Sequence, residues 1–289
     1  MTTVAERPAR DQDPTAEYHV YEPHKVGLPP LGPYFRELWR RRQFMVGLAR
    51  ADLRVQHFNT AFGQFWLLLN PLLLTLVYFM LVTIVRGGSR GSEFFAHLML
   101  CLFTFRFVSR SIREGGTSVI GGGQLILNTA FPRMLLPLSA VIAGVLRFLP
   151  TLLLYAIVHV ALGLPIGPEL LWALPIFAIM AVFATGVTLL VATAQVYFRD
   201  LKHFLRYFLR IWLYTSPVIY YAQDVPERFQ PIMKANPLYP MLTSLSDAVN
   251  QGLTPSASLI GYSCLWAIGS ILIGTFFFMS REREFAIRL

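Results

Sequence analysis

The sequence is poor in charged residues and in cysteine. Only 14% of its 289 residues are Asp, Glu, Lys or Arg, 55% are hydrophobic, and the mean hydropathy is +0.52. Because soluble domains carry about 25% charged residues, this composition excludes an ordinary soluble protein and indicates an integral membrane protein. The two cysteines, Cys101 and Cys264, both lie in apolar stretches, which favours small buried side chains over a disulfide or a metal ligand.

Motifs for several chemistries are also missing. The glycine cluster at 121–123 is not followed by Gly-Lys-Ser/Thr, so it cannot be a phosphate-binding Walker A loop, and we interpret it as a flexible connector. None of the 16 acids falls in the middle of a predicted span, and His97 and His159 each lie alone near a span end. Ion-coupled carriers and intramembrane hydrolases usually need such a group at depth, so both classes are disfavoured. We expect no cofactor on this chain and, if it is a pump, a separate ATP-hydrolysing subunit.

Long apolar runs predict six transmembrane helices. Each run reaches the roughly 18 residues that a helix needs to cross a bilayer, but the fifth is short as an apolar run, because only residues 211–222 of it are free of charge. The predicted spans are 62–85, 94–112, 135–162, 170–196, 204–222 and 258–280. Residues 1–33 mix acids, bases and prolines without an apolar core, so we predict a disordered cytosolic tail rather than a secretory signal.

The distribution of Lys and Arg orients these spans. With the N-terminus inside, the outer loops hold Arg86, Arg90, Arg228 and Lys234, and all others of the 25 basic residues lie in cytosolic segments except Arg106 and Arg147. The positive-inside rule then places both termini of the protein, which crosses its membrane several times, in the cytosol. The excess positive charge therefore indicates topology rather than nucleic-acid binding.

Two segments do not fit plain spans. Residues 224–250, between spans five and six, are too apolar for an ordinary loop and too rich in proline and polar residues to cross, so we predict two short helices in a re-entrant hairpin from the outer side, the second beginning at Asn236-Pro237. In the region 34–61, Phe44, Leu48, Ala51, Val55 and Phe58 share one helical face. This pattern predicts a basic amphipathic interface helix, whose role is either substrate contact or simple anchoring to anionic lipid.

Five motifs, in order, resemble a known family. They are FGQFWLLLNPLLLTLVYFMLV in span one, NTAFPRMLLPLSAV entering span three, VYFRDLKHF after span four, TSPVIYY in span five and NPLYPML in the hairpin. Over residues 34–289 the chain resembles the permease subunits of ABC-2 type polysaccharide exporters, which include O-antigen, teichoic acid and galactan exporters. It departs from their pattern at Gln56-His57-Phe58 and Phe62-Gly63, where members commonly carry Arg-Tyr and Leu-Gly.

The resemblance implies a transport subunit rather than an enzyme. Two copies of this chain would work with two separate ATP-binding subunits, which hold ATP and Mg, to move a polyprenyl-diphosphate-linked polysaccharide outward through the membrane. Six spans are also few to enclose a glycan passage, which by itself favours a homodimer. The alternatives are an ABC-2 permease for a drug or another lipid and, from another class, a membrane-embedded glycosyl- or acyltransferase, for which no catalytic acid–base pair is evident.

Arginines and aromatics are the candidates for substrate contact. Guanidinium groups bind phosphate oxygens through paired hydrogen bonds, although ordinary positive-inside charge explains the same residues. Arg106 and Arg147 are costly inside spans, and with no buried acid available they would face a water-filled passage, a partner or, for Arg106, snorkel to the surface. The candidates for substrate entry are Arg40, Arg41, Arg42, Arg50 and Arg54, and those for the translocation path are Arg147, Arg106, Phe103, Trp212 and Tyr214.

Cytosolic turns are the candidates for contact with an ATPase. The apolar-rich stretch QLILNTAFPR predicts a short docking helix, and YFRDLKHF marks a second turn in which Asp200 caps the next helix or pairs with a base. The coupling candidates are Gln124, Leu125, Leu127, Asn128, Phe131, Arg133, Arg199, Asp200, Lys202 and His203. The outer-gate candidates are Pro226, Asn236, Pro237 and Tyr239. Pro71 and Pro217 are interpreted as kinks, either hinges or static bends.

Overall fold

The computed structural model describes residues 30–56, 65–88 and 91–288. Within them the chain is helical, with no strand. Residues 1–29 of the predicted tail, the span entry around Phe62-Gly63, and His57 and Phe58 lie outside the described residues. The last three residues of the predicted tail, 31–33, are not disordered, because they form the start of α1. The α-helices are α1 (Leu31–Arg40), α2 (Arg42–Gln56), α3 (Trp66–Arg86), α4 (Gly91–Gly121), α5 (Gly123–Asn128), α6 (Leu135–Ala161), α7 (Ala173–Tyr197), α8 (Leu201–Thr215), α9 (Gln230–Lys234), α10 (Leu238–Asn250), α11 (Ala257–Arg281) and α12 (Phe285–Arg288).

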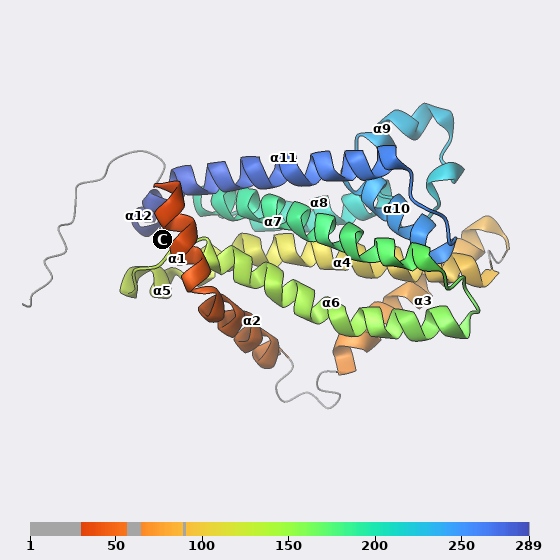
Figure 1. Ribbon diagram of the computed structural model, residues 1–289, viewed down its shortest axis with the longest axis horizontal. Helices are drawn as coiled ribbons and strands as arrows, with labels where there is room; N and C mark the ends of the chain where they lie inside the picture. The colour runs from red at the N-terminus through yellow and green to blue at the C-terminus, as the bar shows by residue number, and fades with distance from the viewer. Residues whose placement is uncertain (1–29, 57–64, 89–90, 289) are drawn as a thin grey trace, which may run out of the picture.

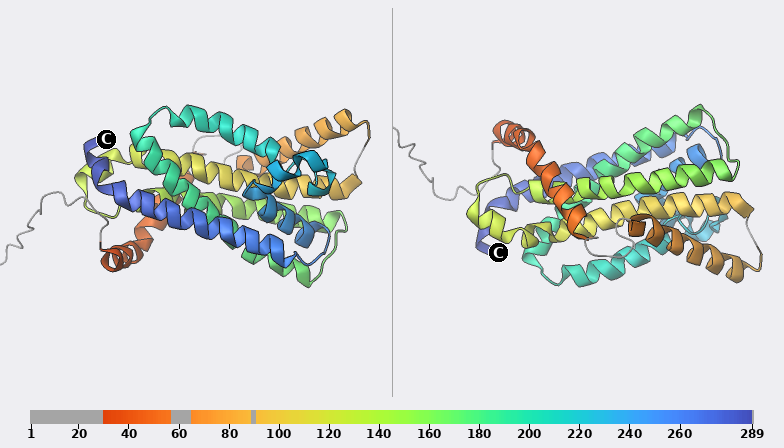
Figure 2. Two further views of the ribbon diagram at one scale, coloured as in Figure 1. Left: turned by 90° about the horizontal axis from the view of Figure 1, so that it is seen from above. Right: turned by 90° about the horizontal axis from the view of Figure 1, so that it is seen from below.

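Among the described residues, five helices are long and apolar enough to cross a membrane, namely α3, α4, α6, α7 and α11. They form a bundle with their axes running roughly along one direction (Figures 1 and 2). Each lies within a few residues of its predicted span, apart from α4, which continues to Gly121 rather than ending at 112. The predicted connector 121–123 is consequently reduced to the single residue Gly122 between α4 and α5.

Helix α4 forms the centre of the bundle. In its most apolar stretch 78% of the residues are buried, against 11% for α3 at the periphery. Around α4 pack α6, α7, α8, α10 and α3. Its buried side chains, such as Leu98, Met99 and Leu102, are almost all apolar, so burial of apolar surface holds the neighbouring helices around it.

The fifth predicted span is not a single long helix. Helix α8 has 15 residues, about 22 Å of helix, and ends at Thr215 because Ser216 is extended (ψ 150°) before Pro217. Pro217 therefore follows the helix and does not kink it, unlike Pro71, which lies inside α3 as predicted. The rest of the bundle's length on this side is filled by residues 216–229 and by the two short helices α9 and α10 (Figure 2).

The two short helices expected after α8 are present. Helix α10 packs against α4, α7 and α11, with Leu238, Met241, Leu242 and Leu245 fully buried. Asn236 lies just before it, and its Oδ1 accepts a hydrogen bond from the Leu238 amide at 3.0 Å. The hairpin is thus inserted into the bundle at the end opposite to α1, α5 and α12 (Figure 1).

Helices α1 and α2 leave the bundle as an angled arm (Figure 1). The side of α2 that packs on α6 carries Ala49, which is buried, and the half-buried Met45 and Leu53. The predicted apolar face is a different one, since Phe44 and Ala51 are exposed and Leu48 is half-buried. Packing on α6 therefore uses one side of α2, while the Phe44 ring lies edge-on against Phe131, with 6.0 Å between the centroids.

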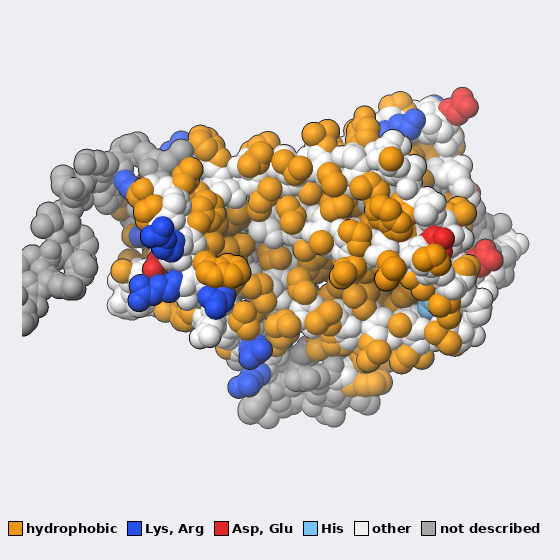
Figure 3. Space-filling view, in the orientation of Figure 1, with side chains coloured by type: hydrophobic (Ala, Val, Ile, Leu, Met, Phe, Trp, Pro, Cys, Tyr) orange, Lys and Arg blue, Asp and Glu red, His pale blue; other side chains and the backbone are white. Residues whose placement is uncertain are grey.

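Side-chain types are segregated along the bundle. Figure 3 shows apolar side chains covering the middle of one face, with Lys and Arg gathered toward the end that carries α1 and α2. Large apolar residues such as Leu76, Leu174 and Leu272 are more than half exposed. In water this surface would be unfavourable, whereas in a bilayer it is the expected lipid-facing band.

Candidate functional site

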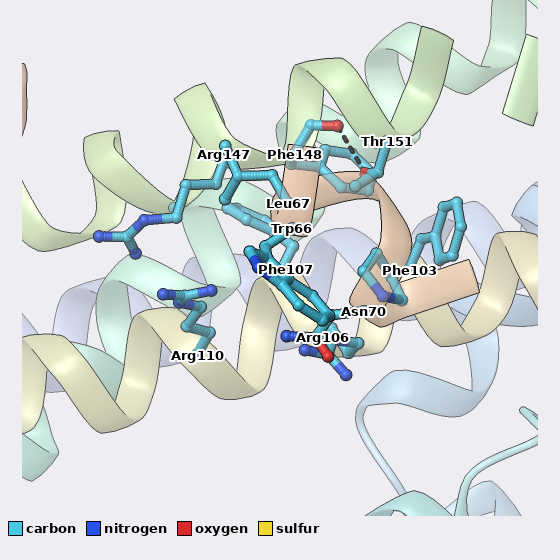
Figure 4. A pocket seen from close by; sticks show the side chains of 12 residues that line it. Trp66, Leu67, Asn70, Phe103, Arg106, Phe107, Arg110, Arg147, Phe148 and Thr151 are labelled. Carbon is cyan, nitrogen blue, oxygen red and sulfur yellow. Dashed lines mark hydrogen bonds between the residues drawn. The ribbon is translucent and has the colours of Figure 1, made fainter. Parts of the chain in front are cut away.

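A polar pocket lies between α3, α4 and α6. Among the lining residues, Arg106 and Arg110 come from α4, Arg147 from α6 and Trp66 and Asn70 from α3. Figure 4 shows the Arg147 and Arg110 guanidinium groups on one side of this space and that of Arg106 on the other, with Trp66 and Phe107 between them in this view. The cavity of about 70 Å³ is therefore a cationic and aromatic space inside the apolar bundle.

Arg147 is held by two carboxylates. Its side chain is 4% exposed, and its Nη1 and Nη2 donate to Glu114 of α4 and Asp52 of α2. Glu114 also accepts from Arg110 Nε at 2.6 Å. The expectation that no acid is available to Arg147 is therefore wrong, because α4 continues past residue 112 and brings Glu114 opposite α6.

The Arg147 network ties the arm to the bundle. Asp52 belongs to α2, Glu114 to α4 and Arg147 to α6, so one guanidinium group joins three helices. Burying such a group is tolerated only when its charge is balanced and its donors are bonded. Arg147 Nε has no hydrogen-bond partner within the part of the chain that the structure describes.

The five residues predicted for a translocation path fall into two places. Phe103, Arg106 and Arg147 line the pocket described above. Trp212 lies elsewhere, where its ring contacts Phe105, Phe183 and Phe208. Tyr214 is 45% exposed on α8, with its hydroxyl 3.5 Å from that of Tyr78. The structure therefore groups the first three and separates the last two from them.

The five arginines predicted for substrate entry all lie on the arm or at its bend. Arg41 pairs with Glu37 at 2.5 Å, and Arg42 lies over the Trp39 ring at 5.2 Å. Arg40, Arg50 and Arg54 are exposed. None of the five lines the pocket, but Asp52, which joins the arm to Arg147, lies between Arg50 and Arg54 in the sequence.

The predicted docking helix is α5. Ile126 is buried beneath it, while Gln124, Leu127 and Asn128 are exposed, with Leu127 57% exposed. Leu125, Phe131 and Arg133 are half-buried where the segment returns to α6. The buried side chain of Ile126 thus fixes α5 to the bundle, and the three exposed side chains lie at the end that carries α12.

The C-terminal segment joins α5 and α6 to the arm. Glu282 is 7% exposed and accepts hydrogen bonds from the Tyr34 hydroxyl at 2.6 Å and the Arg133 amide at 2.5 Å. Burial and the Glu282 carboxylate raise the pKa of Tyr34, and burial lowers the pKa of Arg133. The Arg133 guanidinium also donates to the Glu282 carbonyl. Glu282 therefore connects α1 with the loop that follows α5.

The second coupling turn lies between α7 and α8. Arg199, Asp200, Lys202 and His203 are all exposed. Asp200 occupies the cap position before α8, but its side chain makes no cap hydrogen bond. Arg199 donates to the carbonyl of Arg288 at 3.2 Å. The turn and α5 therefore both contact the C-terminal helix α12.

Of the outer-gate candidates, Asn236 has the most contacts. It is 7% exposed, accepts from Trp212 Nε1 at 2.8 Å and donates to Ser216 Oγ at 2.9 Å. It thereby fixes the end of α8 to the start of α10. Tyr239 is half-buried beside a cleft, Pro226 is exposed and Pro237 precedes the first turn of α10.

Sequence reasoning missed Asp52, Glu114, Glu282, Tyr34 and Trp66. All three acids lie outside the predicted spans, and their partners are 33, 95 and 149 residues away in the sequence. One local signal was available, because Arg110 and Glu114 are four residues apart and share a helix face if span two continues.

Taken together, the fold defines a multi-pass helical membrane protein with a cationic pocket at the arm. No protein-family model matches the chain. It is similar to an O-antigen export system permease protein RfbA of Klebsiella pneumoniae, at 29% identity over 84% of this chain and 93% of that protein. A second Klebsiella pneumoniae protein of that name matches at 29% over 72% of this chain and 80% of its own length, and one from Myxococcus xanthus at 28% over 87% and 97%.

These matches confirm the resemblance that the motifs indicated. The chain is similar, over most of its length, to proteins named as permeases of O-antigen export systems, as expected of the polysaccharide exporter permeases that it resembles. The relatives are named as permeases, so the chain is placed with transport subunits rather than enzymes.

Proposed function

We propose that this chain is the membrane-spanning subunit of an exporter that moves a polyprenyl-diphosphate-linked polysaccharide from the cytosolic to the outer side of the bacterial inner membrane. The observation that carries the proposal is similarity over 84% and 87% of the chain to permeases named for O-antigen export. The polysaccharide would be of the O-antigen, teichoic acid or cell-wall galactan type.

The charge distribution supports the direction. Both described ends of the chain, α1 and α12, lie at the same end of the bundle, together with α5 and the turn before α8 (Figure 1). Arginines are concentrated there, on the arm, as the positive-inside rule requires of a cytosolic face. In this orientation Arg40, Arg41, Arg42, Arg50 and Arg54 would meet the diphosphate of a lipid-linked substrate as it leaves the inner leaflet.

A separate motor completes the proposal. We assign ATP and Mg binding to a partner subunit, present in two copies with two copies of this chain. The exposed side of α5 and the turn Arg199–His203 supply its docking surface, and both contact the C-terminal segment. Force applied at either turn would reach the arm through Glu282 and Tyr34.

Deletion and purification test the function together. Deleting the gene for this chain should abolish surface polysaccharide and leave lipid-linked glycan inside the cell. In a separate experiment, an ATP-binding subunit should copurify with the chain. The complex should hydrolyse ATP faster when lipid-linked glycan from the same cells is added to proteoliposomes.

Two results would overturn the proposal. Unchanged surface polysaccharide after deletion would remove glycan as the substrate, and stimulation by drugs or other lipids instead would favour the alternative ABC-2 permease. Activity of the chain alone, without any ATP-binding subunit, would favour the membrane-transferase alternative. Complementation with the unaltered chain controls for effects on neighbouring genes.

A further inference from the structure

A polar cleft lies at the end of the bundle opposite to the arm. It is formed by α4, the segment after α8 and the α9–α10 hairpin, and its volume is about 390 Å³. Ligand sites for small molecules begin at roughly 300 Å³, so one or two rings of a polar molecule would fit. The cleft shares no lining residue with the polar pocket between α3, α4 and α6 and is therefore a separate cavity.

The walls of the cleft combine amides, charges of both signs and aromatic rings. Gln223, Gln230 and Gln251 offer amides, Asp247 offers a carboxylate whose charge the Lys234 ammonium group balances overall, and Tyr239 offers an aromatic ring with a hydroxyl. Amides and carboxylates accept and donate hydrogen bonds in pairs that match neighbouring hydroxyl groups. An aromatic ring packs against an apolar face of the ligand while its hydroxyl bonds to the polar edge. This combination suits a sugar ring.

One wall is held in position by internal contacts. His97 Nδ1 lies 2.6 Å from Ser246 Oγ, and His97 Nε2 lies 3.3 Å from the Tyr220 carbonyl. Its ring also lies against that of Tyr221, with 4.3 Å between the centroids. These contacts connect α4, α10 and the segment after α8. They hold the Tyr221 ring in place at the wall of the cleft without a ligand.

Asp247 is the side chain that internal contacts leave unexplained. It lies on α10, is partly buried, and has no side-chain hydrogen bond or salt bridge among residues 30–56, 65–88 and 91–288. A half-buried carboxylate without a partner costs stability, so a structural role does not account for it. Burial raises its pKa to about 6. Lys234 lines the same cleft but forms no salt bridge with Asp247 among the described residues.

We infer that this cleft binds an uncharged sugar unit of the exported chain at the outer end of the protein, with Asp247 and the glutamine amides bonding its hydroxyls and Tyr239 packing on its ring. The inference rests on the proposed function and names a second contact for the same substrate, remote from the diphosphate. Because a glycan has many identical units, such a site would hold successive units as they leave.

Photo-crosslinking from the cleft tests the inference. The photoreactive residue p-benzoylphenylalanine replaces Gln251 in cells that make the glycan, or Gln223 where the first variant does not export. After illumination the chain is purified and its covalently bound sugar is measured by acid hydrolysis. The control position is Ile166, which is 71% exposed in the α6–α7 loop at the same end of the bundle.

We expect sugar on the chain from position 251 and none from position 166. Adding Asp247→Ala should lower the yield about tenfold, as loss of one charge-assisted hydrogen bond predicts, whereas Asp247→Asn should retain more of it. Normal export with no sugar at 251 and 223, or a yield unaffected by Asp247→Ala, would overturn the cleft and leave the proposed function standing. Surface glycan that does not depend on this chain would instead overturn the proposed function.

Discussion

At the scale of single residues, charge balance decides which arginines matter to the fold. Arg147 is buried and bonded to two carboxylates, whereas Arg41 makes a similar pair with Glu37 at the exposed arm. A buried pair that loses one partner leaves an uncompensated charge, while an exposed pair is weakened by water and salt. The two pairs should therefore respond differently to the same substitution.

Glu114→Gln should destabilise the protein by about 3 kcal/mol, because Arg147 would keep only the half-exposed Asp52 as its charged partner. Glu37→Gln, the matched control on α1, should cost less than about 1 kcal/mol. Thermal unfolding in detergent, followed by loss of the folded peak in size-exclusion chromatography, measures both. Equal shifts for the two variants would show that the Arg147 network does not hold the arm.

Asp247 should lower stability as pH rises. Its ordinary pKa of about 3.9 applies to the unfolded chain and its folded value is about 6, so between these values the folded state binds more protons. The contribution of Asp247 to the free energy of unfolding is therefore largest below about pH 4 and is lost as the pH rises to about 6. The groups that face this carboxylate are His97, Cys101, Tyr221, Lys234 and Tyr239.

Asp247→Asn should therefore stabilise the protein at pH 7, by about 1 kcal/mol after allowance for its partial exposure. The difference from the unaltered chain should vanish near pH 4, which thermal unfolding at both pH values measures. A destabilised Asp247→Asn at pH 7 would mean that the carboxylate has a stabilising partner, and that it is not held in readiness for a ligand.

At the scale of helices, close approach of α7 and α11 depends on glycine. A methyl group added at Gly186 would lie 2.2 Å from the backbone carbon of Ser270, and one at Gly274 would lie 2.2 Å from the Gly186 carbonyl. In a membrane, where apolar surface gives little preference for helix contact, such small residues let backbones pack directly.

Gly186→Ala should destabilise the protein by about 1–3 kcal/mol, since backbone atoms on α11 must move apart. Gly269→Ala, on α11 itself, has no atom within 4 Å of the added methyl and should be neutral or slightly stabilising. Thermal unfolding of the two variants in one detergent separates helix packing from helix propensity. Equal stability would mean that the two helices are not in close contact.

Helix α5 offers an exposed apolar residue where docking is proposed. Leu127→Glu should reduce the amount of ATP-binding subunit that copurifies by about tenfold, while thermal unfolding of the chain stays unchanged because the side chain is 57% exposed. Leu171→Glu, exposed at the opposite end of the bundle, is the control. Copurification unaffected by Leu127→Glu would exclude this side of α5 from the interface.

Sequence predicted some helices better than others for physical reasons. Runs such as 135–162 are defined by the bilayer length and matched α6 within one residue. The run before Ala222 was extended too far, because Ser216 before Pro217 ends α8 where hydropathy alone continues. The packing face of α2 was also missed, since exposed Phe44 and inward-facing Ala49 satisfy two different apolar surroundings.

The sites show the same limit. The composition of the pocket was partly predictable, because Arg106 and Arg147 stand out in apolar runs. The partners of Arg147 were not, since neither the length of α4 nor the return of α2 onto α6 is encoded by a local pattern. The cleft at Asp247 is assembled from three separate segments, and of the four outer-gate candidates only Tyr239 is among its lining residues.

At the scale of the whole molecule, the pocket that the described residues of one copy form between α3, α4 and α6 is too small for a polysaccharide. The pocket between α3, α4 and α6 has a volume of about 70 Å³, well below the roughly 300 Å³ of an ordinary ligand site. Helix α3 is the least buried of the five long helices and lies on the outside of that pocket. A second copy against α3 would enclose a larger space next to the arginines.

A cysteine at the middle of α3 should therefore crosslink two copies. In a two-fold symmetric pair the same surface of each copy meets its equivalent on the other. The variant Leu76→Cys is made in a chain that also carries Cys264→Ser and is treated with a short bis-maleimide in native membranes. It should give a crosslinked product of twice 32.8 kDa. Leu272→Cys on α11, which is exposed to a similar degree, should stay monomeric. Because neighbouring positions on α3 could miss the axis, Leu73→Cys and Met80→Cys extend the scan along the exposed face. Crosslinks from Leu272 but from none of the three α3 positions would place the partner on α11 and leave the pocket facing lipid.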